Sequence, residues 1–355
     1  MVKLKRALGA FVVPLLSILL AFIIGGIIMA LLGADPFAAV KYLFQGAFGS
    51  KANIGTTLSK ATPLIFTSLC ACFAYKCGVF NLGGEGQFLM GSMAAFLTAY
   101  FTGMTGFGGI VVALLAGTLA GGIWGAIPGV LKITRGQNEM IISIMLNYVA
   151  TLLMGVIYTT WIRDESVPQT PAVDELVRIP RVITGMRFTW AFVIAIVVGL
   201  LLYYVLFWTS SGFKLRAVGY NMTASRFNGI HVSRCLLSSF IVSGAIAGLG
   251  GGAELLGTQF RLINGFGAGY GFDGVAMALI GQLHPIATMV VALFFAVLRV
   301  GSTTMQAATG VPTSVSDIIQ ALVIVFSVAG MALTKLPEFN AWKNRVFSKR
   351  KAGDK

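Results

Sequence analysis

Charged residues are scarce in this sequence. Only 11% of the 355 residues are Asp, Glu, Lys or Arg, whereas a typical soluble domain has about 25%. Hydrophobic residues make up 57% of the chain. A chain with so little charge cannot cover its surface with hydrated groups, so the composition excludes an ordinary soluble domain and favours a protein that faces lipid.

Several catalytic and metal-binding signatures are also missing. The chain has two histidines, no H-E-x-x-H and no cysteine pair at zinc spacing, so no metal site is predicted. It has no G-x-x-x-x-G-K-[ST] motif, so ATP hydrolysis within this chain is not expected. Gly269 to Gly274 fits G-x-G-x-x-G but lacks the βαβ context of a dinucleotide site. Since no nucleophile has a base beside it, no catalytic residue is predicted and a membrane enzyme is the least favoured class. The four cysteines lie in or beside apolar runs, where no disulfide is expected.

Long apolar runs are plentiful. A membrane-spanning helix needs about 20 apolar residues. Four runs free of charged residues predict such helices: 11–32, 107–131, 140–161 and 188–208. Six further candidates carry one or two charges or a glycine-rich break: 57–76, 79–101, 235–257, 262–283, 286–307 and 315–334. The sequence therefore predicts an all-α integral membrane protein with about ten transmembrane helices.

The basic residues suggest an orientation for these helices. Lys3, Lys5 and Arg6 precede the first run, which lacks an A-x-A cleavage pattern and is interpreted as a retained helix with its N-terminus inside. Alternating ten spans from there puts most of the 26 Lys and Arg on the cytoplasmic side, including those of the basic tail 335–355. Both termini are therefore expected in the cytoplasm, and the net charge of +14 needs no nucleic acid to explain it.

Two segments look like interrupted membrane helices. They are FNLGGEGQFLMGSMAAF (80–96) and NGFGAGYGFDGVAMALIG (264–281), and each places an acidic residue in a glycine cluster. They fall in the third and eighth predicted spans, the same place in two halves of five helices, about 1–187 and 188–334. An odd number of helices per half makes such a repeat inverted. Broken helices at a repeat interface are typical of transport paths, although the similarity is short enough to arise by chance.

Glycines recur every fourth residue in two other spans. One series is Gly117, Gly121, Gly125 and Gly129, and the other is Gly244, Gly248 and Gly252. Each series forms a smooth helix face on which a neighbouring backbone can approach closely. We expect these faces to serve packing.

Two loops have features beyond simple connection. Loop 209–234 is basic and has helical character around Met222 to Phe227, with Asn221 and Gly229 as start and stop signals. Such a helix could press on a soluble cytoplasmic partner, and the alternative is a solvated topology loop. Loop 162–187 mixes acids, arginines and prolines, which favours an ordered surface feature that meets an external partner.

Four blocks of sequence resemble one family. FNLGGEGQFLMG (80–91) closely resembles the F-N-I-G-x-E-G-Q-x-x-x-G motif of permeases from bacterial ABC importers of the ribose and nucleoside type. Three further family blocks have counterparts in the same order: RGQNEMIISIMLNYVA (135–150), LRAVGYNMTASRFNGI (215–230) and GYGFDGVAMALIGQLHP (269–285). The E-G-Q version is typical of the nucleoside branch. Mild departures occur at Gly84 and Gln137.

This resemblance implies a function and partners. The chain would be a permease subunit in the bacterial cytoplasmic membrane, forming the translocation path for nucleosides, purine nucleosides foremost. It would have no cofactor of its own, since a separate ABC ATPase docked on the 209–234 loop would bind ATP and Mg. A second homologous permease, forming a heterodimer, and an extracytoplasmic binding lipoprotein would complete the importer. Open alternatives are the same machinery carrying a simple sugar or riboflavin, or an ion-coupled carrier in which Glu85, Asp273, Asp317 or Glu254 titrates or binds the ion.

Polar residues at membrane depth are the candidate path or gate residues, because a charge there costs at least roughly 2.5 kcal/mol and usually faces a cavity or a partner. They are Asn81, Glu85, Gln87, Asn147, Asn264 and Asp273, with nearby aromatic residues that could stack on a nucleobase: Phe80, Phe88, Tyr148, Phe266, Tyr270 and Phe272. The alternative for the two acids is that they satisfy backbone N–H groups at helix breaks. The predicted ATPase contacts are Arg216, Asn221, Ser225, Arg226 and Asn228.

Overall fold

The described part of the chain is helical. The structure, a computed structural model, describes residues 2–164, 167–183, 185–267 and 269–335, with side chains from residue 15 to residue 330. Almost all of the predicted basic tail, from residue 336 on, lies outside the described residues. Within them the extended pairing is limited to two isolated bridges, Gln169 with Ile263 and Arg181 with Thr189. The predicted all-α class is therefore confirmed for the described residues.

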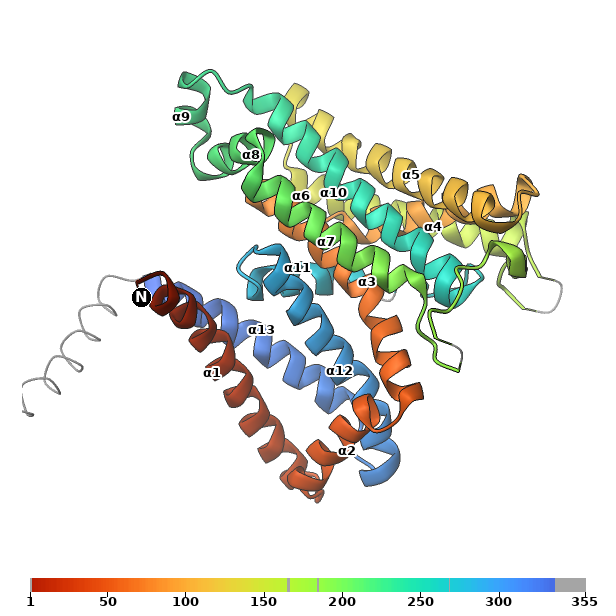
Figure 1. The fold of residues 1–355 in the computed structure, drawn as a ribbon, viewed down its shortest axis with the longest axis vertical. Coiled ribbons are helices and arrows are strands. Elements are labelled where there is room, and N and C mark those ends of the chain that lie inside the picture. Colours follow the sequence, from red (N-terminus) through yellow and green to blue (C-terminus); the bar gives the residue numbers. More distant parts are fainter. Residues whose placement is uncertain (1, 165–166, 184, 268, 336–355) are drawn as a thin grey trace, which may run out of the picture. The chain divides into compact units, whose positions relative to one another are not determined.

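The helices follow one another along the described residues (Figure 1). The α-helices are α1 (Val2–Leu31), α2 (Pro36–Phe48), α3 (Lys51–Lys76), α4 (Gly84–Phe101), α5 (Gly106–Arg135), α6 (Glu139–Val156), α7 (Trp190–Trp208), α8 (Ser210–Tyr220), α9 (Met222–Phe227), α10 (Val232–Glu254), α11 (Tyr270–Ile280), α12 (Pro285–Thr309) and α13 (Thr313–Lys335). Three short elements join them: the π-helices η1 (Ile157–Trp161) and η3 (Leu255–Gln259), and the 3-10 turn η2 (Glu175–Val177).

Seven of the described helices are long and apolar enough to cross a membrane. They are Lys51–Lys76, Gly106–Arg135, Glu139–Trp161, Trp190–Trp208, Val232–Gln259, Pro285–Thr309 and Thr313–Gly330. A bent pair, Leu15–Leu31 with Pro36–Phe48 at 117°, can add an eighth span. The chain is therefore a multi-pass membrane protein.

Each of the ten predicted spans contains a helix, but two begin late. In the predicted span 79–101 the helix starts at Gly84, and in the span 262–283 it runs only from Tyr270 to Ile280. Irregular backbone precedes both starts, as the prediction of interrupted helices required. Two helices were missed. No helix was predicted for α2, which carries Lys41 and Gln45 in a short apolar stretch, and α8 was included in the 209–234 loop.

The chain divides into two compact units. One comprises Met1–Gly46 and Gly301–Lys355, of which residues 2–46 and 301–335 are described, and the other comprises Ala47–Val300. In the first unit α1 packs against α13, where Gly25 leaves room for the Ile319 side chain. There α2 also lies against the end of α12, because a Cβ atom at Gly301 would occupy the backbone of Leu43.

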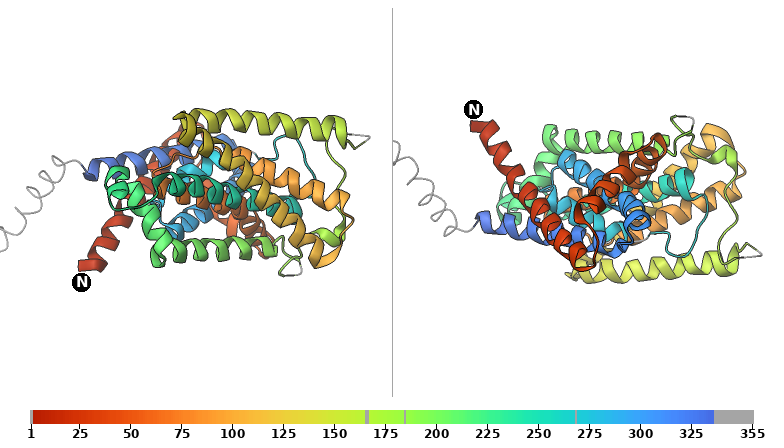
Figure 2. Two further views of the ribbon diagram at one scale, coloured as in Figure 1. Left: turned by 90° about the horizontal axis from the view of Figure 1, so that it is seen from above. Right: turned by 90° about the horizontal axis from the view of Figure 1, so that it is seen from below.

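Glycine faces hold together the centre of the second unit. A Cβ atom at Gly121 would overlap Gly244 and Gly248, and one at Gly91 would overlap Gly248. The backbones of α4, α5 and α10 therefore touch directly, as membrane helices do where small residues line both faces. The predicted packing role of these glycines is confirmed. Figure 2 shows α6 and α7 on opposite sides of this unit, with α4, α5 and α10 between them.

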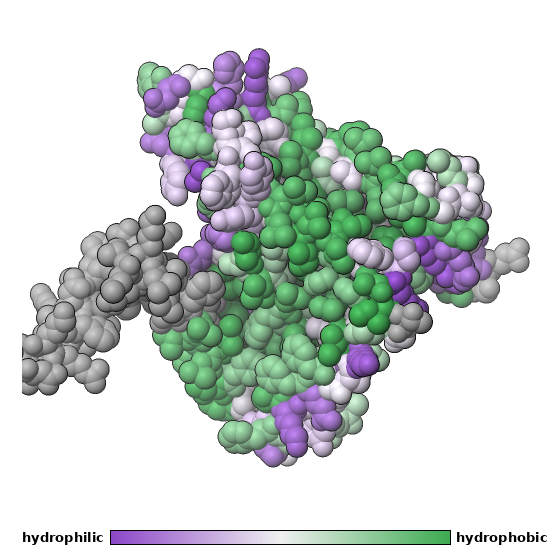
Figure 3. All heavy atoms as spheres, in the orientation of Figure 1, coloured by the Kyte–Doolittle hydropathy of each residue, from purple (hydrophilic) through white to green (hydrophobic). Residues whose placement is uncertain are grey.

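Polar segments lie at the two ends of the second unit (Figure 3). At one end α8 rests on the last turn of α3, because a Cβ atom at Gly219 would meet the backbone of Lys76. At the other end the 162–189 loop pairs with the end of α10: the Val173 N–H donates to the Phe260 carbonyl at 2.9 Å, and the Ile179 N–H to the Leu256 carbonyl at 2.8 Å. The described residues of this loop, predicted as 162–187, thus form an ordered feature, as expected.

Candidate functional site

The two acidic glycine clusters meet in space. Glu85, in the first turn of α4, accepts the N–H of Gly271 through Oε2 at 2.6 Å and the N–H of Gly269 through Oε1 at 3.1 Å. These N–H groups open α11, where no intrahelical acceptor is available and the helix dipole favours a negative charge. Glu85 therefore satisfies backbone groups at a helix break, and the break belongs to the other half of the chain.

A buried amide network fixes the irregular segment before α4. Asn81 Nδ2 donates to Gln87 Oε1 at 3.0 Å and to Ser243 Oγ at 2.9 Å, while Asn81 Oδ1 accepts Gln87 Nε2 at 3.1 Å and the Gly83 N–H at 2.9 Å. Asn81 and Gln87 are each 1% exposed. Ser243, from α10, was missed because a serine among apolar residues gives no distinctive pattern.

Asn147 of α6 also holds the backbone at the start of α4. Its Oδ1 accepts the Gly86 N–H at 2.8 Å, and its Nδ2 donates to the Leu82 carbonyl at 2.9 Å. A side-chain amide supplies one acceptor and one donor, which is what an unwound backbone in an apolar setting needs. Three of the predicted path residues, Asn81, Gln87 and Asn147, thus shape the backbone at the start of α4.

An ion pair lies near Glu85. Arg299 of α12 donates through Nη2 to Asp273 Oδ2, and about 30% of each side chain is exposed. The Arg299 guanidinium carbon lies 5.5 Å from the centroid of the Tyr270 ring, which in turn packs edge-on against Phe88 at 5.8 Å. Arg299 was not among the predicted site residues, although a lone arginine inside an apolar span is itself a signal of function.

The remaining predicted path residues are not among those that make the hydrogen bonds and the ion pair described above. Phe88 and Phe266 are buried and pack together at 6.1 Å. Four of the remaining predicted residues have exposed side chains: Phe80, Tyr148, Phe272 and Asn264. Exposed aromatic side chains are available for stacking, whereas Phe88 serves packing in this structure. The path assignment of all these residues stays a prediction.

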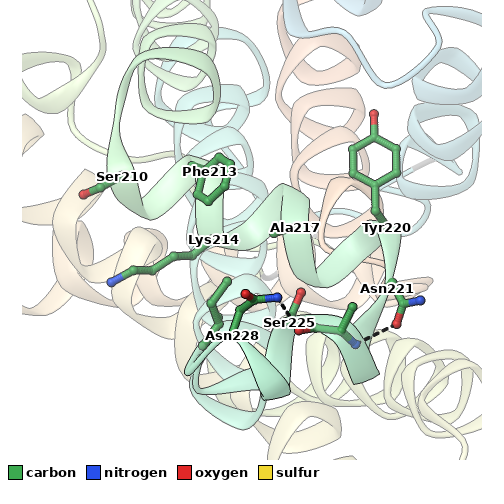
Figure 4. A pocket seen from close by; sticks show the side chains of 10 residues that line it. Ser210, Phe213, Lys214, Ala217, Tyr220, Asn221, Ser225 and Asn228 are labelled. Carbon is green, nitrogen blue, oxygen red and sulfur yellow. Dashed lines mark hydrogen bonds between the residues drawn. The ribbon is translucent and has the colours of Figure 1, made fainter.

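At the end of the unit that carries α8 and α9, a short helix stands clear of the long ones. Asn221 caps α9 by accepting the Ala224 N–H at 2.9 Å, and Asn228 Nδ2 donates to the Ala224 carbonyl at 2.9 Å (Figure 4). The predicted helix Met222–Phe227 and its start signal are confirmed. A groove of about 700 Å³ lies between α8 and α9, lined among others by Phe213, Lys214 and Tyr220.

The predicted ATPase contacts differ in how they present their side chains. Arg226 and Asn228 are exposed, whereas Ser225 of α9 has a buried side chain. Arg216 turns inward, with its guanidinium 5.1 Å from the centroid of the Phe207 ring. Sequence reasoning missed the aromatic residues of this surface: Tyr220 and Phe227 are both 88% exposed. Large exposed aromatics beside a basic residue suit contact with a protein partner.

Broken helices joined through charged residues inside a multi-pass membrane protein define a membrane transport protein as the class. The family described as "Branched-chain amino acid transport system / permease component" matches residues 53–328. The match covers well over half of the chain, so this chain belongs to that permease family.

Three curated relatives extend the comparison. The guanosine ABC transporter permease protein NupP of Bacillus subtilis is 32% identical over 92% of this chain and 96% of its own length. The glucose ABC transporter permease protein TsgB13 of Haloferax volcanii is 32% identical over 90% of this chain and 87% of its own. The nucleoside ABC transporter permease protein NupB of Lactococcus lactis is 32% identical over 96% of each. No solved structure matches.

Proposed function

We propose that this chain is the translocating permease subunit of an ATP-driven importer of nucleosides, with purine nucleosides foremost. The proposal is supported by family membership and by sequence similarity over most of the chain to permeases named for guanosine and for nucleosides. The family description names branched-chain amino acids, but none of the three relatives above bears that substrate in its name. The permease fold is therefore shared while the solute differs.

The cytoplasmic membrane of a bacterium is the proposed location, with ten spans in two inverted halves and both termini inside. The charge distribution supports this orientation, since the last turns of α3 and α5, which carry Lys76, Lys132 and Arg135, lie at the same end of the Ala47–Val300 unit as the basic α8–α9 segment. Reporter fusions test it: a tag after residue 355 should be protected from external protease, and one inserted in the 162–189 loop should be cleaved. The reverse pattern would refute the orientation.

The proposed partners follow from the exposed surfaces at the two ends. A separate ABC ATPase that binds ATP and Mg would dock on α9, through Arg226 and the exposed Phe227. A substrate-binding lipoprotein would deliver solute at the 162–189 loop, and a second homologous permease would form a heterodimer with this chain. Gentle purification from the native membrane with mass spectrometry of co-purifying proteins tests all three.

In the proposed path, the start of α11 is the gate. Glu85 holds it through Gly269 and Gly271, and the partly exposed Asp273–Arg299 pair stands next to it. An ion pair at membrane depth that keeps some exposure fits a watered path better than lipid contact. Exposed Phe272 and Phe80 would offer stacking surfaces along it.

Uptake assays test the transport reaction. Proteoliposomes containing the whole importer should accumulate labelled guanosine only with internal ATP. Uptake that survives ATP depletion but stops when an ion gradient collapses would identify an ion-coupled carrier instead. A sugar is the second candidate solute, because the glucose permease is as similar in identity as the nucleoside permeases. Competition by glucose but not guanosine would favour it.

A further inference from the structure

Glu254 is a buried carboxylate with an oxygen that has no partner. It lies in the last turn of α10, is 1% exposed, and uses Oε1 to accept a hydrogen bond from Gln259 Nε2 at 3.2 Å. Oε2 is buried, and among the described residues no donor meets it at hydrogen-bond geometry, although the Thr258 hydroxyl is near the carboxylate. The Lys60 charge acts on the carboxylate, but the two side chains form no ion pair. Burying an unmatched acceptor is costly, so its presence here calls for a ligand or a function.

The backbone around Glu254 carries two further marks of a functional site. The π-helix η3 begins at the next residue, and Phe260, which ends it, is a non-glycine residue with φ of 60°. Single π-turns inside α-helices and left-handed bulky residues both cost energy and cluster at functional sites. The 162–189 loop holds this segment through the Leu256 and Phe260 carbonyls, so the strain is supported from outside α10.

Other polar side chains gather at the same place. The Thr258 hydroxyl lies within hydrogen-bonding reach of the carboxylate, and its oxygen is 3.4 Å from Ser59 Oγ on α3. Together with Gln259 and Lys60, these groups provide several donors and acceptors around the carboxylate.

This cluster is coupled to the proposed gate through one aromatic residue. The Tyr270 phenol interacts electrostatically with Glu254 and also with Arg299 and Asp273. Glu254 is near the end of α10 that pairs with the 162–189 loop, the end that the proposed orientation places outside. A solute entering from outside would reach the Glu254 cluster before the Asp273–Arg299 pair.

We propose that Glu254 is a specificity-determining residue that accepts a hydrogen bond from a sugar hydroxyl of the transported solute. The proposal rests on the proposed function. A carboxylate is the group that proteins use to bind ribose hydroxyls in dinucleotide sites, since each oxygen can accept an O–H donor. Guanosine, nucleosides and glucose, the solutes in the relatives' names, share sugar hydroxyls and differ in the rest of their structure.

The test compares two solutes in the complete importer, reconstituted with its binding lipoprotein and ATPase. Initial ATP-driven uptake is measured for guanosine and for 2′,3′-dideoxyguanosine, and the ratio of the two rates is compared between wild type and variants. Any preference of the binding lipoprotein is the same in every preparation and cancels. Glu254→Leu, which removes the acceptor at similar volume, should lower the ratio about tenfold or more, the value of one hydrogen bond to a charged group. Glu254→Gln should lower it less.

Controls separate this role from a structural one. Asp35→Asn removes an exposed carboxylate charge before α2, keeps the oxygen that accepts the Phe37 N–H, and should leave the ratio unchanged. If Glu254→Leu slows both solutes by the same factor, the carboxylate is structural and the proposal is wrong. If the Glu254→Leu variant does not assemble into the importer, an unchanged uptake ratio in Glu254→Gln overturns the proposal. Wild type that ignores nucleosides but takes up glucose would refute the proposed substrate alone, and the same ratio is then measured for glucose against deoxyglucose.

Discussion

Glu85 accepts a 2.6 Å hydrogen bond from the backbone N–H of Gly271, which lies 186 residues further along the chain. The carboxylate at the start of α4 thereby caps the start of α11. An isolated helix usually carries its own cap, so this arrangement makes the two broken helices depend on each other. If the start of either helix moves, the Glu85 hydrogen bonds must break or move with it. These bonds can therefore control that movement.

Glu85→Gln should weaken this junction. A glutamine has one acceptor oxygen where the carboxylate uses two, and its NH₂ group would face a backbone N–H donor. The expected loss is about 1–3 kcal/mol, since bonds to charged groups are the stronger ones. It is measured as a lower midpoint of thermal unfolding for the purified protein in detergent. Glu175→Gln is the control, and an equal midpoint in both variants would contradict the assigned role of Glu85.

Asn147→Leu should destabilise the break before α4 more than Asn147→Asp does. Leucine leaves both the Gly86 N–H and the Leu82 carbonyl without a partner. Aspartic acid in its neutral form, which burial favours, keeps an acceptor for Gly86 and an O–H donor for Leu82. Each buried backbone group without a partner costs about 1–3 kcal/mol. Unfolding midpoints of the two variants and wild type check the order. If leucine were the better tolerated, Asn147 would not be holding the backbone there.

Gly248→Ala should disrupt the contact of α10 with α5. The added methyl group would overlap the Gly117 carbonyl and the backbone of Gly121, neither of which can rotate away. Close helix packing is the main attraction between helices in lipid, so the variant should unfold at lower temperature or fail to accumulate. Gly108→Ala, also on a membrane helix, meets nothing within 4 Å and is the matched control. Equal behaviour of the two variants would show that the glycine contact adds nothing.

Local sequence patterns predict part of this architecture, and contacts between distant residues decide the rest. Apolar runs locate the helices because lipid demands about 20 such residues per span, and Asn221 with Gly229 brackets α9 because capping is local. The α2 helix escapes this reasoning, since its polar residues interrupt a short run whose stability comes from packing on α12. Likewise, the acids Glu85 and Asp273 are visible in the sequence, but their partners Gly271 and Arg299 emerge only from the fold.

The surface of α9 yields the last prediction. Arg226 and Phe227 stand exposed on a short helix that Asn221 caps and α8 anchors to the end of α3. A charge reversal, Arg226→Glu, should abolish uptake by repelling an acidic docking surface, while membrane insertion stays normal. Phe227→Ala should weaken binding of the ATPase about tenfold or more, because exposed aromatics that become buried at an interface contribute most of its affinity. Both effects are measured as ATPase retained on the tagged permease. Arg181→Glu makes the same charge change on the exposed 162–189 loop and should retain the ATPase fully. Wild-type retention and uptake in Arg226→Glu would move the docking surface away from α9.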